Sequence, residues 1–70
     1  MGGIQLQKYI ERMITERNEL KGRILRAKAA VDNPPYGSDL EGINLLSTQV
    51  CCMEQYLDIL ERRIEHEKTK

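Results

Sequence analysis

The feature that most constrains the fold is a pair of apolar stripes at heptad spacing, one on each side of two adjacent prolines. In the first stripe the positions recur at alternating steps of four and three residues, with one arginine among them: Leu6, Ile10, Met13, Arg17, Leu20, Ile24, Ala27 and Val31. The second stripe repeats the pattern without interruption: Ile43, Leu46, Val50, Met53, Leu57, Leu60 and Ile64. This is the a/d pattern of helices that pack side by side. Because the stripes are similar in length, they predict antiparallel partners.

The connection between the stripes has clear boundary signals. Asn33 precedes Pro34 and is therefore biased out of the helical region, which ends the first helix near Asp32. Ser38 and Glu41 have the spacing of a capping box, which predicts Ser38 as the N-cap of the second helix. The chain is expected to be one all-α domain over 1–70, an antiparallel two-helix hairpin with a helix over 4–32, a loop over 33–38 and a helix over 39–67.

A hairpin of 70 residues is marginal on its own, and association is the means of stabilisation that the sequence leaves open. Cys51 and Cys52 are adjacent and cannot bridge each other within a helix. The segment 42–53 carries no charge, and a second stripe follows one residue behind the first. We therefore expect a homo-oligomeric helical bundle. Its expected interface comprises Leu45, Leu46, Gln49, Val50, Cys52, Met53, Tyr56 and Ile59.

The charge distribution limits the possible partners. The formal net charge is zero, which argues against binding to DNA or RNA polymers. No segment of the sequence is expected to span or enter a membrane, and no signal peptide is visible, so a cytoplasmic location is expected. Bases predominate up to Ala30 and acids from Val31 to Glu61. Opposite charges could face each other across the seam, or the two halves could simply be solvated faces that differ.

The Asn33-Pro34-Pro35-Tyr36 stretch matches a catalytic motif of amino-methyltransferases, but its context excludes that function. The motif requires a parallel sheet and a glycine-rich loop for the methyl donor, neither of which the sequence contains. The prolines are interpreted as a hinge, while Tyr36 could also serve recognition.

Basic residues late in the first helix, an aromatic ring in the loop and the start of the second helix are the parts needed to hold a nucleotide phosphate and a base. The candidate ligand-binding residues are Lys21, Arg23, Arg26, Tyr36, Ser38, Gln49 and Tyr56. The alternative is that the basic residues only complement the helix dipole. Arg17 could fix the register of the seam or line a polar pocket. Gly22 could mark a close approach of another helix or a ligand.

The sequence offers little for catalysis, metal binding or cofactor binding. No acid–base pair accompanies a nucleophile, and Cys52 has no histidine within helical reach. His66 is the only histidine, and structural zinc spacings are absent. We expect a protein that is not an enzyme and has no catalytic residue, metal or cofactor.

Parts of both helices resemble small hairpin proteins encoded by bacterial viruses. The matching positions are Tyr9, Met13, Leu20, Arg23, Ile24, Leu45, Leu46, Gln49, Met53, Tyr56, Leu60, Arg63 and Ile64. Some such hairpins resemble anti-defence sponges, oligomers that sequester the cyclic nucleotide or ADP-ribose-type signals of CBASS and Thoeris immunity. The His-His-Pro-Pro opening of the best-known sponge hairpins is missing here. The resemblance implies a phage protein of the host bacterial cytoplasm that binds its ligand between subunits without cleaving it. The alternative is a protein–protein interaction or structural coiled-coil module with no small ligand.

Overall fold

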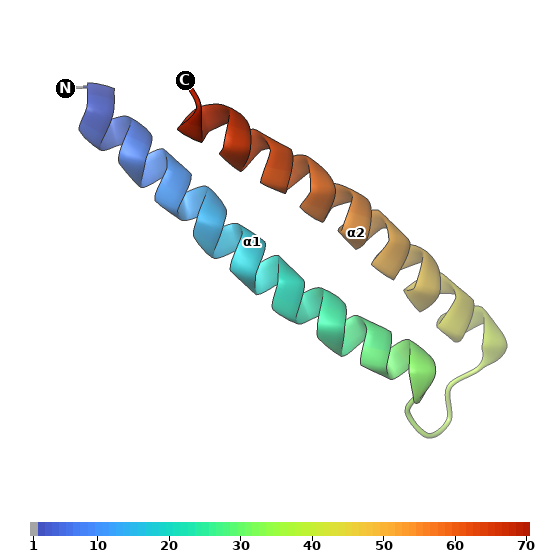
Figure 1. Ribbon diagram of the computed structural model, residues 1–70. Coiled ribbons are helices and arrows are strands. Elements are labelled where there is room, and N and C mark those ends of the chain that lie inside the picture. The colour runs from blue at the N-terminus through green and yellow to red at the C-terminus, as the bar shows by residue number, and fades with distance from the viewer. Residues whose placement is uncertain (1) are drawn as a thin grey trace.

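The two apolar stripes meet along the single seam of a helical hairpin. In the computed structural model, α1 (Gly2–Asp32) and α2 (Leu40–Lys68) run antiparallel side by side, joined by one turn, with both chain ends at the other end of the rod (Figure 1). The structure describes the backbone from residue 2 and the side chains from residue 6. The described part measures 54 × 16 × 13 Å. The all-α two-helix hairpin predicted from the heptad pattern is confirmed.

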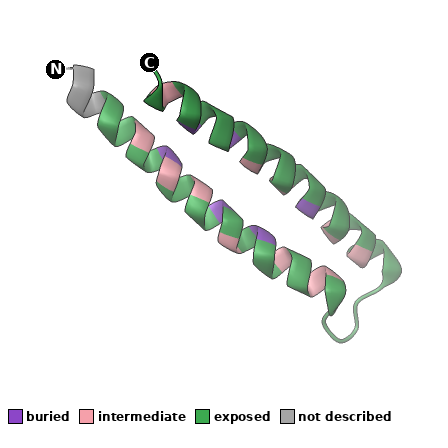
Figure 2. Cartoon of the chain, in the orientation of Figure 1, coloured by how far each residue is buried: buried purple, intermediate pink, exposed green. Residues whose placement is uncertain are grey.

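The buried residues all belong to the predicted stripes, and Figure 2 places them between the helices. Leu60 is 0% exposed and Ile64 2% exposed, and they pack with three residues of α1, Met13, Leu20 and Ile24. Leu and Ile at heptad spacing interdigitate along such a seam, and each fully buried side chain contributes about 1.5–3 kcal/mol relative to an exposed one. The core is thus one narrow strip, deepest in the half of the rod that holds the chain ends.

The turn separates the helices through a proline step and one left-handed residue. α1 ends at Asp32, directly before the Asn33-Pro34 step. Gly37 has φ of +88°, a conformation that costs glycine little and other residues more. Ser38 donates its hydroxyl hydrogen back to the carbonyl oxygen of Pro35 at 2.7 Å. The turn is therefore held by its own backbone and one side chain.

The prediction that Ser38 caps α2 is wrong, because Asp39 takes that position. Asp39 has extended backbone angles (φ −100°, ψ 168°), and its carboxylate accepts a hydrogen bond from the Gly42 amide at 2.8 Å. With its hydroxyl turned to Pro35, Ser38 belongs to the turn instead. Asp and Ser are equally good caps, so sequence spacing alone could not separate two adjacent candidates. α2 consequently begins at Leu40.

Asp39→Ala should lower the free energy of unfolding by about 1 kcal/mol, because the Gly42 amide loses its acceptor. Ser38→Ala removes only an exposed hydrogen bond within the turn and should have a smaller effect. Urea unfolding of the two variants at equal protein concentration makes the comparison. A larger loss for Ser38→Ala would show that the cap had been assigned to the wrong residue.

The outward side of α2 keeps apolar residues in water. Leu45 is 65% exposed, Ile59 50% and Tyr56 42%, and Cys52 is exposed and free. Of the remaining members of the expected interface, Gln49 is exposed, while Leu46, Val50 and Met53 belong to the seam stripe, where Val50 is 7% exposed. No helix in the described part of the chain is both long and apolar enough to cross a lipid bilayer.

Candidate functional site

One side of the hairpin carries a repeating set of polar side chains from both helices. On α1 their residue numbers rise in steps of seven toward the turn, and on α2 they fall in steps of seven toward the turn. We call this side the tyrosine face, and its three levels are Tyr9 with Arg63, Glu16 with Tyr56, and Arg23 with Gln49. Residues seven apart lie above one another on a helix, and the helices are antiparallel, so the levels succeed one another along the rod about 10 Å apart.

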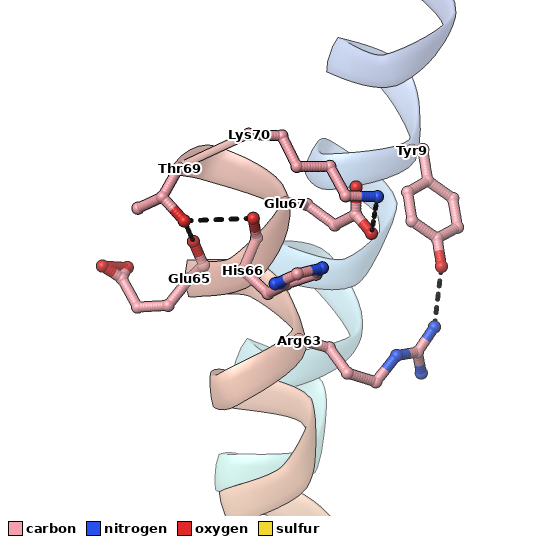
Figure 3. A network of polar contacts seen from close by, with 7 residues as sticks. All are labelled: Tyr9, Arg63, Glu65, His66, Glu67, Thr69 and Lys70. Carbon is pink, nitrogen blue, oxygen red and sulfur yellow. Dashed lines mark hydrogen bonds and ion pairs between the residues drawn. The ribbon is translucent and has the colours of Figure 1, made fainter.

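Direct contacts connect the helices at two of these levels. Arg63 donates from a terminal guanidinium nitrogen to the Tyr9 hydroxyl at 2.7 Å, and Figure 3 shows this contact between α2 and α1. At the next level the Tyr56 hydroxyl donates to the Glu16 carboxylate. Neither pair was predicted from the sequence. The sequence pattern that could have predicted these pairs is the shared interval of seven between Tyr9 and Glu16 and between Tyr56 and Arg63. It becomes informative only once the register between the two helices is known.

The Glu16 contact changes the acidity of Tyr56. The hydrogen bond to Glu16, then burial and the negative charge of Glu16, raise the pKa of the Tyr56 hydroxyl above its usual 10.0, and Arg63 lowers it by a smaller amount. A raised pKa means that folding favours the protonated phenol. The contact therefore stabilises the hairpin below pH 10.0, and its contribution is lost as the pH rises through the raised pKa.

This shift predicts the outcome of an alkaline titration. The phenolate absorbance of the folded wild-type protein and of Tyr56→Phe should differ by one tyrosine step, centred above pH 10.0. Circular dichroism over the same range verifies that the helices stay folded. If the step that Tyr56→Phe removes were centred at or below pH 10.0, the result would contradict the Tyr56–Glu16 contact.

The third level differs from the other two because, among the described residues, no hydrogen bond or ion pair joins its two side chains across the seam. Arg23 is exposed and forms no ion pair with any residue that the structure describes. Gln49, which the spacing of seven places at the same level, has only a weak contact, from its amide nitrogen to the Met53 sulfur at 3.9 Å. A guanidinium offers five donors in a planar fork, and an amide offers a donor and an acceptor. Arg23 and Gln49 can therefore both bind an incoming anionic group.

Beyond this level, toward the turn, small residues leave a hollow of about 240 Å³. Ala30 lies seven residues after Arg23 and Gly42 seven before Gln49, so the next level of the tyrosine face has only small residues. Pro34, Pro35, Ser38, Asp39, Ile43 and Leu46 complete the lining. The start of α2 beside it already holds carboxylates, because Asp39 is the cap and Glu41 follows in the first turn. A phosphate is better placed at Arg23 than at the α2 amides.

The opposite side of the seam, which we call the lysine face, is occupied by ion pairs. Lys21 lies 3.6 Å from the Glu61 carboxylate and Lys28 3.0 Å from Glu54. A groove of about 400 Å³ runs along these pairs and also contains Asp58, so it has more acids than bases. The expectation that opposite charges face each other across the seam is confirmed by the two pairs. Each is about half exposed and contributes at most about 1 kcal/mol.

The remaining candidate residues lie apart from one another. The guanidinium of Arg26 folds back toward Gly22, where a methyl group would meet it at an ordinary 3.5 Å. Tyr36 stands in the turn, fully exposed. Lys21 is eleven residues before the end of α1, about 16 Å along the helix from the turn. Within one hairpin Tyr36 and Lys21 therefore do not reach the same small ligand.

The structure bears on two of the alternatives that the sequence leaves open. No basic residue lies in the last turn of α1, and the dipole effect fades within that turn, so the dipole does not explain the basic residues. Arg17 directs its guanidinium to the neighbouring Asn18 at 3.3 Å and meets no acid across the seam among the described residues. Its head therefore leaves the seam while its stem packs there.

Comparison with known families finds one match for this chain. The model of one family, described as Sequestin, matches residues 7–66, which include most of both helices. The chain belongs to the Sequestin family. No curated protein and no solved structure matches. The family name denotes sequestering, which is binding rather than catalysis, and it does not say what is bound. Among the described residues no cluster of three or more His, Cys, Asp or Glu could hold a metal ion.

Proposed function

We propose that this Sequestin-family chain is a phage-type sponge that binds and holds a nucleotide-derived immune signal without cleaving it. The ligand is a cyclic oligonucleotide or a cyclic ADP-ribose-type molecule of CBASS or Thoeris immunity, and the location is the host bacterial cytoplasm. The observation that carries the proposal is the family match over residues 7–66, because the family name indicates sequestering and the match includes most of both helices.

The anionic character of the ligand is inferred from Arg23. A bidentate arginine is the side chain best suited to a phosphate, and this one is exposed and, among the described residues, without an acid partner, at the level that the spacing also gives to Gln49. Tyr56 is held at the next level by Glu16 and leaves part of its ring accessible for stacking. We therefore place phosphate groups at Arg23 and Gln49 and a base or ribose between Tyr56 and the hollow at the turn.

The other candidate residues have secondary roles in this proposal. Ser38 lines the hollow at the turn and Tyr36 stands fully exposed in the same turn, so both would contact the part of the ligand that extends beyond the hollow. Lys21 and Arg26 point elsewhere in the same hairpin and would contribute their charge to a ligand from a neighbouring subunit. This division agrees with binding between subunits of a homo-oligomer.

A thermal-shift screen against cyclic oligonucleotides and cyclic ADP-ribose isomers tests the proposal. A ligand present at a thousandfold excess over its Kd stabilises the folded state by about 4 kcal/mol, which raises the Tm of a small domain by well over ten degrees. The expected result is one class of signal that shifts Tm, with AMP and ADP-ribose as weak or inactive controls. Absence of a shift with every member of the panel would contradict the proposal for these ligands.

A second candidate is an interaction module that binds a protein and no small ligand. The exposed apolar residues on α2, among them Leu45 and Ile59, favour it because such residues usually pack against something. The same screen separates the candidates, since an interaction module should shift with none of the nucleotides. No binding to DNA or RNA polymers, or to membranes, is proposed.

A further inference from the structure

The outward side of α2 repeats its chemistry in reverse on either side of Cys52. Seven residues before and after Cys52 stand the apolar Leu45 and Ile59, and eleven residues before and after it stand the oppositely charged Glu41 and Arg63. All five residues are exposed, and steps of four, seven and eleven keep them on one face of a helix. The residues four positions away, Thr48 and Tyr56, carry a hydroxyl each.

We propose that two copies of this chain pair through this face, α2 against α2 in antiparallel orientation, with a two-fold axis at Cys52. In such a pair a residue before Cys52 lies level with the residue equally far after Cys52 in the second copy. Leu45 then packs on Ile59 of the second copy about 10 Å from the axis. Glu41 meets Arg63 of the second copy about 16 Å from the axis. The proposal specifies the symmetry of the oligomer on which the proposed function rests.

The charges favour a second copy in this orientation over other occupants. A parallel pair would set Glu41 beside Glu41 and Arg63 beside Arg63, whereas the antiparallel pair joins opposite charges at both ends. A different protein would not require the face to repeat itself in reverse. Arg63 already gives one nitrogen to the Tyr9 hydroxyl and has further donors for a carboxylate.

The pairing also completes the ligand site. Gln49 is three residues before Cys52 and so lies level with Gln55 of the second copy, while Leu45 lies level with Ile59. The second copy therefore forms one wall beside Arg23 and Gln49, on the outward side of α2. Two equivalent sites result, and each has residues from both copies.

The two adjacent cysteines provide a matched test on the full chain. Cys52 lies on the axis, whereas Cys51 is turned by about 100° around α2, and the hollow beside it is lined by Glu54, Gln55, Asp58 and Ile59. Cys51→Ser keeps only Cys52, and Cys52→Ser keeps only Cys51. Each purified variant is treated with diamide without ligand. Two thiols form one disulfide, and diamide takes up the two electrons and two protons.

The expected result is a disulfide dimer for Cys51→Ser and little or none for Cys52→Ser on a non-reducing gel. Equal cross-linking of the two variants, faster cross-linking through Cys51, or no cross-linking in either would overturn the proposed axis. Light scattering of the untreated wild-type protein provides a second measurement. A monomer at micromolar concentration would overturn the pairing itself.

A charge exchange examines the ends of the interface. E41R should slow the cross-linking of the Cys52-only variant several-fold, and the double variant E41R/R63E should restore it. Circular dichroism shows whether each variant remains helical. A double variant as slow as E41R would overturn the proposed Glu41–Arg63 contact. The cross-linking is measured without ligand, so it tests the pairing independently of nucleotide binding. A dimer that binds no nucleotide would contradict the proposed function alone. A monomer that binds a nucleotide would contradict the pairing alone.

Discussion

Replacing Leu60 with alanine should remove most of the resistance of the hairpin to unfolding. Leu60 is 0% exposed and packs in the cluster that joins α2 to Met13, Leu20 and Ile24 of α1. Truncating a buried leucine costs about 2–5 kcal/mol, through lost burial and the cavity that remains. A single core in a chain of this size seldom supplies more than about 3–5 kcal/mol. The urea midpoint should therefore fall close to zero denaturant.

Leu25→Ala is the matched control, because it makes the same chemical change on α1 at a side chain that is 69% exposed. Surface substitutions of this kind usually change stability by less than about 0.5 kcal/mol. Both variants must be measured at the same protein concentration, since association contributes to apparent stability. Equal losses in the two variants would contradict the position of the core.

Replacing Arg23 with alanine should weaken binding of the ligand identified by the thermal-shift screen by about ten- to a hundredfold. The estimate follows from about 1.5–3 kcal/mol for hydrogen bonds to a charged group and about 1.4 kcal/mol for each tenfold change in Kd. Arg23 is exposed and outside the core, so the free energy of unfolding without ligand should hardly change. Calorimetric titration measures the Kd.

Arg12→Ala is the control for the loss of a positive charge on α1. Arg12 is also exposed and, among the described residues, forms no ion pair, but it lies eleven residues before Arg23, about 16 Å farther from the turn along α1. Its surroundings there include Lys8, Glu11, Glu16 and Glu19. Its loss should alter the Kd by less than about threefold, as expected for an exposed charge that is screened by salt. Equal weakening by both variants would mean that Arg23 acts only through overall charge.

The fold could be derived from the sequence because two long heptad stripes leave few alternatives. Every member of the second stripe is buried or half-buried, and in the first stripe only Leu6, at 37%, is marginally exposed. Periodicity decides which face of each helix is covered, and Pro34 with Pro35 decides where the chain reverses. Both are local properties, so a single sequence contains them.

The arrangement of the candidate site was not accessible in the same way. Seven residues were selected for their chemistry, and Lys21 and Arg23, only two positions apart, lie on opposite sides of the seam. Which acid meets a base, and which arginine stays open, depends on the register between helices. One residue of slip in that register would change every cross-helix pair on both faces. The choice between Ser38 and Asp39 as the cap likewise depended on a turn conformation that spacing does not determine.

The central claim is that this chain holds a nucleotide signal and leaves it intact, and native mass spectrometry tests it most directly. The wild-type protein is mixed with each cyclic oligonucleotide and each cyclic ADP-ribose isomer, the complexes are weighed, and the bound molecule is then released by heat and weighed again. We predict a complex with one class of signal, with the released molecule unchanged in mass. No complex with any of them, or a released product of altered mass, would contradict the claim.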